Sequence, residues 1–494
     1  MIECSLLFPK KRDFDQYLDE RVISDLSVGT IAAAIDFDEK IMSKYLLDFS
    51  ASEAELEFRH EIADDFIRNE GLFNELINKK SEFELIREKT NDASKDIHSM
   101  MFLREPTTDG GGNYTIVSIF HLVSEALKAY WRFFDDILPI LGNKGFRSAG
   151  LERLKNTFSY IVSGSGFDTL RAEISNYTSL TSLSASYSGV LNFNRSFHIE
   201  KITYETVGTI QRDFRNRQKR KKGIAVKMSN HAVNRVLFNH NKSFAVKLLE
   251  MAQYYQKILE DLYEDLQFYE LYISLKSFYE TNGIPVSLIK DLSAKSISFT
   301  ELSDLSLIAD VVAKGKDVEK NVKSNSAEIK TKKVFVSGMN QGGKTVFIRS
   351  VGITVLLAKA GLPVPAARFF CPDLKSLYTF FPIDDIVYEA NSRFRNELAM
   401  MKKIVENTPC NSLVLMNEPF ISTTEKEAVA LIENLLDFFN RHNTCVITVT
   451  HFKLLLSQID ESAQSFVASG YPSFSVSEES PYLLTGHDLL PFLE

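Results

Sequence analysis

Helical spacing of apolar residues dominates the first half of the chain. Residues 31–105 carry apolar positions three and four apart among many acids and bases, which predicts a small helical bundle. The stretch 106–115, PTTDGGGNYT, is rich in turn-forming residues and is expected to interrupt the bundle. After it, residues 116–141 have the spacing of a long amphipathic helix, and a further helix is expected over 149–162.

One predicted helix is unusually long. Residues 231–281 keep their apolar positions three or four apart, and Gly283 and Pro285 then supply a stop. A helix of about 40 residues is already about 60 Å long, more than a compact domain needs, so we expect it to span distance or transmit motion. Between the helical regions, residues 179–210 are rich in Ser, Thr, Tyr and Ile with partial alternation, which predicts a short antiparallel excursion.

The hydrophobic pattern changes in the last third of the chain. Residues 314–333 are charged and nearly free of large apolar side chains, so we expect a linker or surface loop there. Beyond them, short apolar runs at 334–337, 412–416 and 444–450 are separated by helical stretches. Runs of this kind are typical of strands buried in a parallel sheet, and they predict an α/β nucleotide-binding domain.

Length and composition agree with a multi-domain globular protein. With 494 residues, 44% of them hydrophobic and 25% charged, the chain can bury two or three cores. We expect a helical core and lever domain over 1–313 and an α/β domain over 334–494. No apolar run approaches the roughly 18 residues of a membrane span, and the N-terminus lacks the pattern of a secretory signal, so a soluble, cytoplasmic protein is expected.

A net charge of -8 is unusual for a protein that coats nucleic acid over its whole surface, so any such contact is expected to be local. Residues 211–222 offer one candidate, with a single acid, Asp213, among seven bases. Such a run could engage several phosphates, or it could be a solvated charged loop or helix face. The seven bases are Arg212, Arg215, Arg217, Lys219, Arg220, Lys221 and Lys222.

Residues 338–345, GMNQGGKT, fit the phosphate-binding pattern G-x-x-x-x-G-K-[ST], with a β-branched run before them and a helical pattern after them. Gly338, Gly342 and Gly343 would let backbone N–H groups turn toward phosphate oxygens at a helix N-terminus. Lys344 would neutralise the β- and γ-phosphates of ATP, and Thr345 would hold Mg²⁺. The alternative is a glycine-rich turn in some other α/β protein.

Two further predicted strands end in polar residues suited to the same chemistry. Asn417 and Glu418 follow the run 412–416, and His451 follows the run 444–450. Asn417 stands where an aspartate is expected to help hold the metal, so Mg²⁺ binding is expected to be weaker. Glu418 would orient the attacking water as general base, and His451 would face the γ-phosphate. Alternatively, Glu418 is an ordinary exposed acid and His451 a structural residue.

The motifs resemble, in order and spacing, those of the MutS mismatch-repair ATPases. The resemblance rests on residues 338–366, 392–404 (SRFRNELAMMKKI), 412–419 (SLVLMNEP) and 446–452 (VITVTHF), and extends more weakly to 45–76. It implies a P-loop ATPase domain of the ABC type, in which two subunits sandwich two nucleotides.

The same resemblance implies roles for further residues. Ser392 would reach the partner subunit's nucleotide, although a serine there could also cap a helix. Asn340 would contact phosphate. Residues 180–225 lie where the family places its DNA clamp.

The chain also departs from the family pattern. Met339 and Gln341 replace a proline and a methionine, which is tolerable because the backbone binds the phosphates. Residues 417–425, NEPFISTTE, lack the glycines that follow the acid pair in the family. We expect no room before residue 31 for the mismatch-reading and connector domains, and no C-terminal nuclease module.

These features lead to one main hypothesis and two alternatives. The main hypothesis is a short MutS-like ATPase that dimerises on ATP, with itself or a paralogue, and opens or closes around DNA in repair or recombination. The first alternative is a nucleotide-gated binding or scaffold protein with little or no hydrolysis, suggested by Asn417 and by the altered loop after Glu418. The second is an ATPase that acts on an RNA or protein partner.

Overall fold

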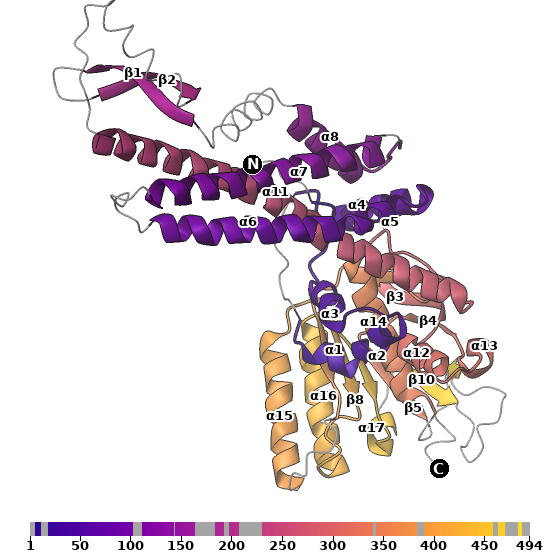
Figure 1. The fold of residues 1–494 in the computed structure, drawn as a ribbon. Coiled ribbons are helices and arrows are strands. Elements are labelled where there is room, and N and C mark those ends of the chain that lie inside the picture. The colour runs from indigo at the N-terminus through magenta and orange to yellow at the C-terminus, as the bar shows by residue number, and fades with distance from the viewer. Residues whose placement is uncertain are drawn as a thin grey trace, which may run out of the picture. The chain divides into compact units, whose positions relative to one another are not determined.

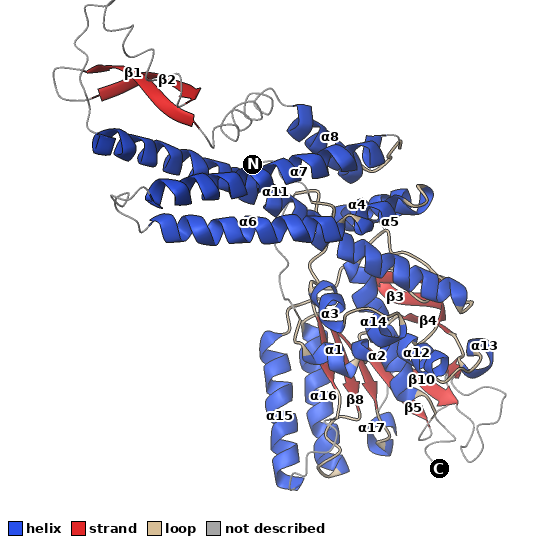
Figure 2. Cartoon of the chain, in the orientation of Figure 1, coloured by secondary structure: helices blue, strands red, loops and turns tan. Residues whose placement is uncertain are grey.

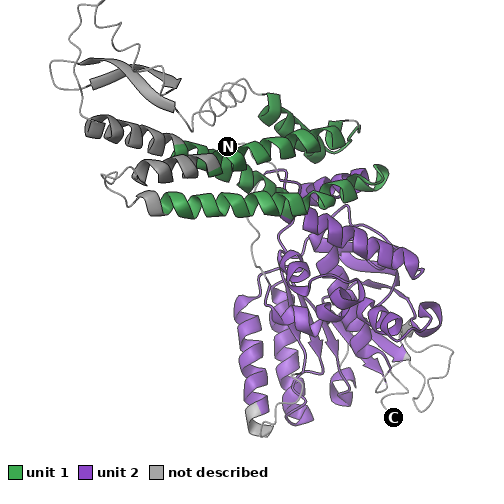
Figure 3. Cartoon of the chain, viewed as in Figure 1, with its two compact units in different colours: residues 1–4, 66–263 green, residues 5–65, 264–494 purple. Residues whose placement is uncertain are grey.

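The computed structural model forms two compact units, one of residues 1–4 and 66–263 and the other of residues 5–65 and 264–494 (Figure 3). The structure describes residues 5–10, 18–101, 111–142, 144–163, 183–191, 197–206, 230–338, 342–382, 390–457, 463–469 and 483–486 (Figure 1). None of the described helices is both long enough and apolar enough to cross a bilayer.

The first unit is built from helices. They are α5 (Leu72–Asn78), α6 (Lys80–Met101), α7 (Gly111–Gly142), α8 (Ala149–Ser163) and most of α11 (Asn230–Thr281). Aromatic rings fill the space between them: Phe134 of α7 meets Phe158 of α8 with ring centroids 5.0 Å apart and Tyr255 of α11 at 5.4 Å. Helices α8 and α11 confirm the predictions for 149–162 and 231–281, whereas α7 begins inside the stretch predicted to be a turn-rich break.

The expected antiparallel excursion within residues 179–210 is confirmed as a hairpin. Strand β1 (Leu183–Leu191) pairs with β2 (Phe197–Thr206) from Leu183↔Thr206 to Leu191↔Phe197. The register shifts between Ser188 and Gly189, so one extra residue bulges there.

The second unit combines short N-terminal helices with an α/β core. Its N-terminal helices are α1 (Arg21–Asp25), α2 (Val28–Ala34), α3 (Glu39–Leu47) and most of α4 (Glu53–Arg68). The later helices are α12 (Leu305–Ala313), α13 (Val318–Asn321), α14 (Lys344–Ala360), α15 (Ala390–Asn407), α16 (Glu425–Arg441) and α17 (Lys453–Ser457). The strands are β3 (Ser293–Leu302), β4 (Asn325–Ile329), β5 (Lys333–Gly338), β6 (Arg368–Pro372), β7 (Leu377–Phe380), β8 (Leu413–Asn417), β9 (Cys445–Val449), β10 (Ala463–Ser469) and β11 (Leu483–Gly486).

The main sheet has the strand order β11-β10-β5-β9-β8-β7, in which only β11 runs antiparallel to its neighbour. The three predicted strands are β5, β9 and β8, and they occupy its centre, where β8 and β9 are buried at every residue. This buried environment explains their continuous apolar runs.

Helices cover both faces of this sheet (Figure 2). On one face, Val414 and Met416 of β8 and Val446 of β9 pack with buried side chains of α15 and α16. On the other face, Gly352 of α14 lies against the side chain of Leu415. The alternation of faces along β8 thus places α14 opposite α15 and α16.

A second, three-stranded sheet with the order β4-β3-β6 lies in the same unit. Its strand β4 and the short helix α13 fall inside residues 314–333, the stretch expected to be a linker or surface loop. That stretch is mostly exposed, but Ile329 is buried while Glu328 is exposed. This period-two alternation is that of an edge strand, and it is too short and polar to stand out in the sequence.

The N-terminal helices belong to the α/β unit rather than to the helical one. Helix α1 contacts β7, α2 contacts α12, and α3 contacts α14. The compact units therefore do not divide at the expected boundary between residues 313 and 334. Local apolar spacing predicts a helix but does not identify the surface on which the helix packs.

Helix α14 is anchored at its C-terminal end by two neighbouring side chains of α4. Arg59 is buried, and its Nη1 donates to the carbonyl of Ala360 at 2.7 Å. His60 is also buried, and its Nε2 lies 3.1 Å from the carbonyl of Gly361. A cation and an N–H donor at this end satisfy carbonyls that the helix leaves free and complement its dipole. Burial lowers the pKa of His60 to about 4.

The low pKa of His60 predicts a pH-dependent contribution to stability. Its unfolded-state pKa is about 6.5, so the unfolded chain binds the extra proton first, and stability falls as the pH drops through about 6.5 toward 4. The substitution His60→Gln keeps an N–H donor at this position but removes the titratable imidazole. We compare the free energy of unfolding of the unmodified protein with that of His60→Gln. This free-energy difference should become about 2 kcal/mol less favourable to the unmodified protein when the pH falls from 7.5 to 5. Denaturant titrations at both pH values measure this; parallel pH profiles for the two proteins would contradict it.

Candidate nucleotide-binding site

The turn that leaves β5 and enters α14 requires glycine at both ends. Gly338 has a φ of +131°, and a Cβ there would lie 2.5 Å from the carbonyl oxygen of Ala468 in β10. Gly343 caps α14 with a φ of +92°. Residues other than glycine rarely adopt either of these φ angles. This explains why a glycine stands at each end of the turn. Gly342 lies beside Gly343 and is buried.

Lys344 is the first residue of α14, and its side chain turns back across the loop. It is only 5% exposed, and its Nζ donates to the carbonyl of Gly338 at 2.9 Å. Burial lowers the pKa of the Lys344 ammonium, and the nearby carboxylate of Glu418 opposes that shift. A cation and the free N–H groups of a 17-residue helix thus face the same turn, which is an arrangement that favours an anion.

Thr345 connects this helix to the end of β8. Its Oγ1 donates to Oδ1 of Asn417 at 3.4 Å, and Asn417 is the last residue of β8. Asn417 is 9% exposed. A hydroxyl and an amide oxygen therefore converge beside the buried ammonium of Lys344, and both are oxygen ligands of the kind that Mg²⁺ accepts.

Glu418 and His451 meet at the ends of the two adjacent strands β8 and β9. The backbone N–H of Glu418 donates to the carbonyl of Val449 at 2.9 Å. Oε1 of Glu418 lies 3.8 Å from Nδ1 of His451, with the carboxylate side chain 29% exposed and the imidazole side chain 51% exposed. A carboxylate and an imidazole that water can reach thus lie together at the edge of the site.

The structure therefore brings together five of the predicted residues: Lys344, Thr345, Asn417, Glu418 and His451. Ser392 lies at the start of α15, where only the backbone is described. Asn340 lies outside the described residues, as do the seven bases Arg212, Arg215, Arg217, Lys219, Arg220, Lys221 and Lys222.

The residues that hold the loop after Glu418 are not among those predicted from the sequence. Phe420 has a φ of +60° and a ring that is 1% exposed. Ser422 donates from Oγ to Oε2 of Glu397 at 2.5 Å. The signal that could have revealed them is the missing glycines of residues 417–425, because a bulky residue in such a turn needs a partner to hold it.

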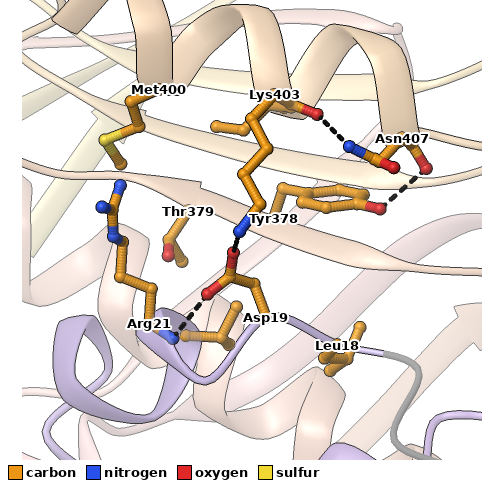
Figure 4. Close-up of a pocket in the computed structure, with 10 residues that line it drawn as sticks. Leu18, Asp19, Arg21, Tyr378, Thr379, Met400, Lys403 and Asn407 are labelled. Atoms are coloured by element: carbon orange, nitrogen blue, oxygen red, sulfur yellow. Dashed lines mark hydrogen bonds and ion pairs between the residues drawn. The ribbon is translucent and has the colours of Figure 1, made fainter. Parts of the chain in front are cut away.

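A separate cavity of about 250 Å³ lies between β7, α15 and residues 18–22 (Figure 4). Lys403 donates to Asp19 at 2.6 Å, and this hydrogen bond lowers the pKa of the Asp19 carboxyl. Tyr378 donates from its hydroxyl to the carbonyl of Asn407 at 2.8 Å. Among the described residues that line this cavity, none was predicted to bind nucleotide, so we assign no nucleotide to it.

Comparison with known proteins adds independent information about this part of the chain. Residues 334–479 match the family model for MutS domain V. The chain is 31% identical over 134 residues to the DNA mismatch repair protein MSH3 of Yarrowia lipolytica, a match that covers 27% of this chain and 13% of that protein.

Two other relatives match over similar lengths. The DNA mismatch repair protein MSH6 of Arabidopsis thaliana is 30% identical over 149 residues, which is 30% of this chain and 11% of that protein. The endonuclease MutS2 of Staphylococcus epidermidis is 26% identical over 158 residues, which is 32% of this chain and 19% of that protein. The chain thus spans less than a fifth of the length of these relatives.

The range matched by the domain V model contains the whole cluster at the ends of β5, β8 and β9, from Gly338 to His451. The resemblance predicted from the sequence motifs is confirmed: residues 334–479 match MutS domain V, and the chain is similar to MSH3 and MutS2 proteins over 27% and 32% of its length.

Proposed function

We propose that this protein is a MutS-like ATPase, in which ATP bound at the turn between β5 and α14 controls a dimer that binds DNA. The observation that carries the proposal is the convergence of the buried Lys344 with Thr345, Asn417, Glu418 and His451. Within a MutS domain V, this set includes a group for each task that phosphate binding and hydrolysis require.

Nucleotide binding depends on the helix N-terminus and on Lys344. The phosphates would accept hydrogen bonds from the N–H groups of the turn, and the glycine conformations at Gly338 and Gly343 keep the backbone close to them. The Lys344 ammonium would exchange its hydrogen bond to the Gly338 carbonyl for phosphate oxygens. Phosphate oxygens carry more negative charge than a carbonyl, so this exchange would strengthen the electrostatic interaction of a buried cation and favour binding.

Thr345 and Asn417 would hold Mg²⁺, since their oxygens already lie 3.4 Å apart beside the loop. When bound, the ion supplies positive charge to the β- and γ-phosphate oxygens. Asn417 contributes an oxygen without the negative charge of an aspartate. The metal site therefore has one negative charge fewer than it would have with aspartate at this position. We infer weaker Mg²⁺ binding from that difference.

Hydrolysis is assigned to Glu418 and His451. The carboxylate of Glu418 orients a water molecule toward the γ-phosphorus and accepts its proton as the new P–O bond forms and ADP leaves. His451, whose Nδ1 is 3.8 Å from that carboxylate, faces the same region and would contact the γ-phosphate. Both side chains are partly exposed, which lets water reach them.

The similarity to MutS proteins supports the proposed dimer formation and DNA binding. Ser392 at the start of α15 would contact the nucleotide of a second subunit, and Asn340 the phosphates of its own. Residues 211–222 would bind DNA phosphates through their seven bases, with strong salt dependence and little sequence information. ATP would shift the dimer between states because its γ-phosphate makes different contacts in each.

A second function is favoured by one observation. Asn417 removes the charge that usually helps hold the metal, which suits a nucleotide-gated binding or scaffold protein that hydrolyses ATP slowly or not at all. In this alternative Glu418 has no catalytic role, so the two functions differ in whether its carboxylate matters for turnover.

The substitution Glu418→Gln separates the two functions. Loss of the general base should lower the rate of ATP hydrolysis by about 10²–10⁴-fold while ATP affinity stays the same, because the phosphate-binding groups remain. Phosphate release and ATP binding, both with and without duplex DNA, measure these effects. Equal phosphate release by both proteins would refute the assigned role of Glu418, and ATP binding with no turnover in the unmodified protein would favour the scaffold.

The substitution Asn417→Asp tests the metal site. A carboxylate in place of the amide should lower the Mg²⁺ concentration needed for half-maximal ATP binding by about tenfold, equivalent to about 1.4 kcal/mol. Asn434→Asp, on the exposed face of α16, is the matched control for added charge. An equal Mg²⁺ dependence in Asn417→Asp and Asn434→Asp would exclude Asn417 from the metal site.

A further inference from the structure

The loop that follows Glu418 has a backbone suited to glycine but contains none. Glu418 and Phe420 have φ angles of +49° and +60°, in the left-handed region that residues other than glycine rarely adopt. The MutS pattern has glycines after its acid pair, where such a conformation is free of strain. This chain keeps a left-handed turn without glycine, so other contacts must hold it in place.

The ring of Phe420 provides the first of these contacts. It is buried, and its centroid lies 5.4 Å from that of Phe380 in β7 and 6.4 Å from that of Phe394 in α15, the latter in an edge-on arrangement. Phe420 also belongs to the core cluster that joins the sheet to α15 and α16. A buried aromatic anchor two residues after Glu418 fixes the path of the backbone.

Ser422 provides the second contact. Its hydroxyl donates to Oε2 of Glu397 at 2.5 Å. The other carboxylate oxygen of Glu397, Oε1, lies 4.0 Å from Nε of Arg393. Glu397 is held on two sides, and its side chain is 12% exposed. A charge-assisted hydrogen bond of this length in a partly buried position is stronger than one between neutral groups.

Both contacts lead to the same short segment of α15. Phe394 and Glu397 lie one helical turn apart, in the first two turns of that helix. Neither belongs to the elements that would bind the phosphates, which are β5 and α14. The loop that positions Glu418 is thus fastened to α15, whereas Lys344 and Thr345 belong to α14.

We propose that Phe420 and Ser422 are positioning residues for Glu418, held by Phe394 and Glu397 of α15, so that the first turns of α15 set the hydrolytic geometry. The inference rests on the proposed role of Glu418. A displacement of these turns would move Glu418 away from His451 and the water while ATP binding continues.

The test compares two adjacent hydroxyls in the full chain. Ser422→Ala removes the bond to Glu397 of α15, and Thr423→Ala removes an equally short bond, 2.5 Å, from Thr423 to Glu427 of α16. We expect the hydrolysis rate at saturating ATP to fall by about tenfold or more in Ser422→Ala, with ATP affinity changed by less than about twofold. Thr423→Ala should change neither quantity, and Ser422→Thr, which keeps a hydroxyl, should recover most of the rate.

The aromatic anchor is tested in the same assay with its own control. Phe420→Leu and Phe439→Leu each replace a buried aromatic ring of the same core cluster by a smaller aliphatic side chain. Of these two residues, only Phe420 lies in the loop. We expect similar losses in melting temperature for both variants and a fall in hydrolysis rate for Phe420→Leu alone. Equal hydrolysis rates in the two variants would show that Phe420 only fills the core.

The outcomes separate this inference from the proposed function. If the unmodified protein hydrolyses ATP and Ser422→Ala behaves like Thr423→Ala, the positioning role is wrong while the ATPase assignment stands. If the unmodified protein does not hydrolyse ATP, the proposed function fails and this inference fails with it. A decrease in ATP affinity equal to the decrease in rate would also overturn the inference, since it would place Ser422 in nucleotide binding.

Discussion

The candidate site depends on the close approach of β5 to β10 at Gly338. The carbonyl oxygen of Ala468 occupies the space that any Cβ on Gly338 would need, and the left-handed Gly343 then starts α14. These two backbone constraints aim the N-terminus of a buried helix at the end of the sheet. They also enclose the ammonium of Lys344, whose pKa is lowered by burial, so the turn combines a helix dipole with a poorly solvated cation.

The remaining groups are supplied by the topology of the sheet. Strands β5, β9 and β8 are parallel neighbours, so their carboxyl ends meet at one edge. Asn417, Glu418 and His451 lie at those ends although they are far apart in the sequence. The opposite end of α14 is held by Arg59 and His60, so this helix is positioned at both termini. Helix α15 contacts the loop after Glu418 through a hydrogen bond and an aromatic pair.

The sequence was most informative where a pattern is both local and continuous. The buried strands β5, β8 and β9 and the 52-residue helix α11 follow from uninterrupted apolar spacing. The residues grouped around Lys344 follow from glycine spacing and from polar residues at strand ends. The sequence did not reveal β4, whose five residues contain two exposed polar side chains, or the packing of α1, α2 and α3 on the α/β unit. Those features depend on contacts between distant segments. The aromatic anchor at Phe420 was missed for the same reason, because its partners Phe380 and Phe394 lie 40 and 26 residues earlier.

The central claim is that the turn between β5 and α14 encloses a triphosphate, and equilibrium binding of ATP to the full chain tests it most directly. We predict saturable binding of about one nucleotide per chain, weakened about tenfold or more by Lys344→Ala in a protein whose melting temperature shows that it is folded. Failure of the unmodified protein to bind ATP, or equal affinity in Lys344→Ala, would contradict the account.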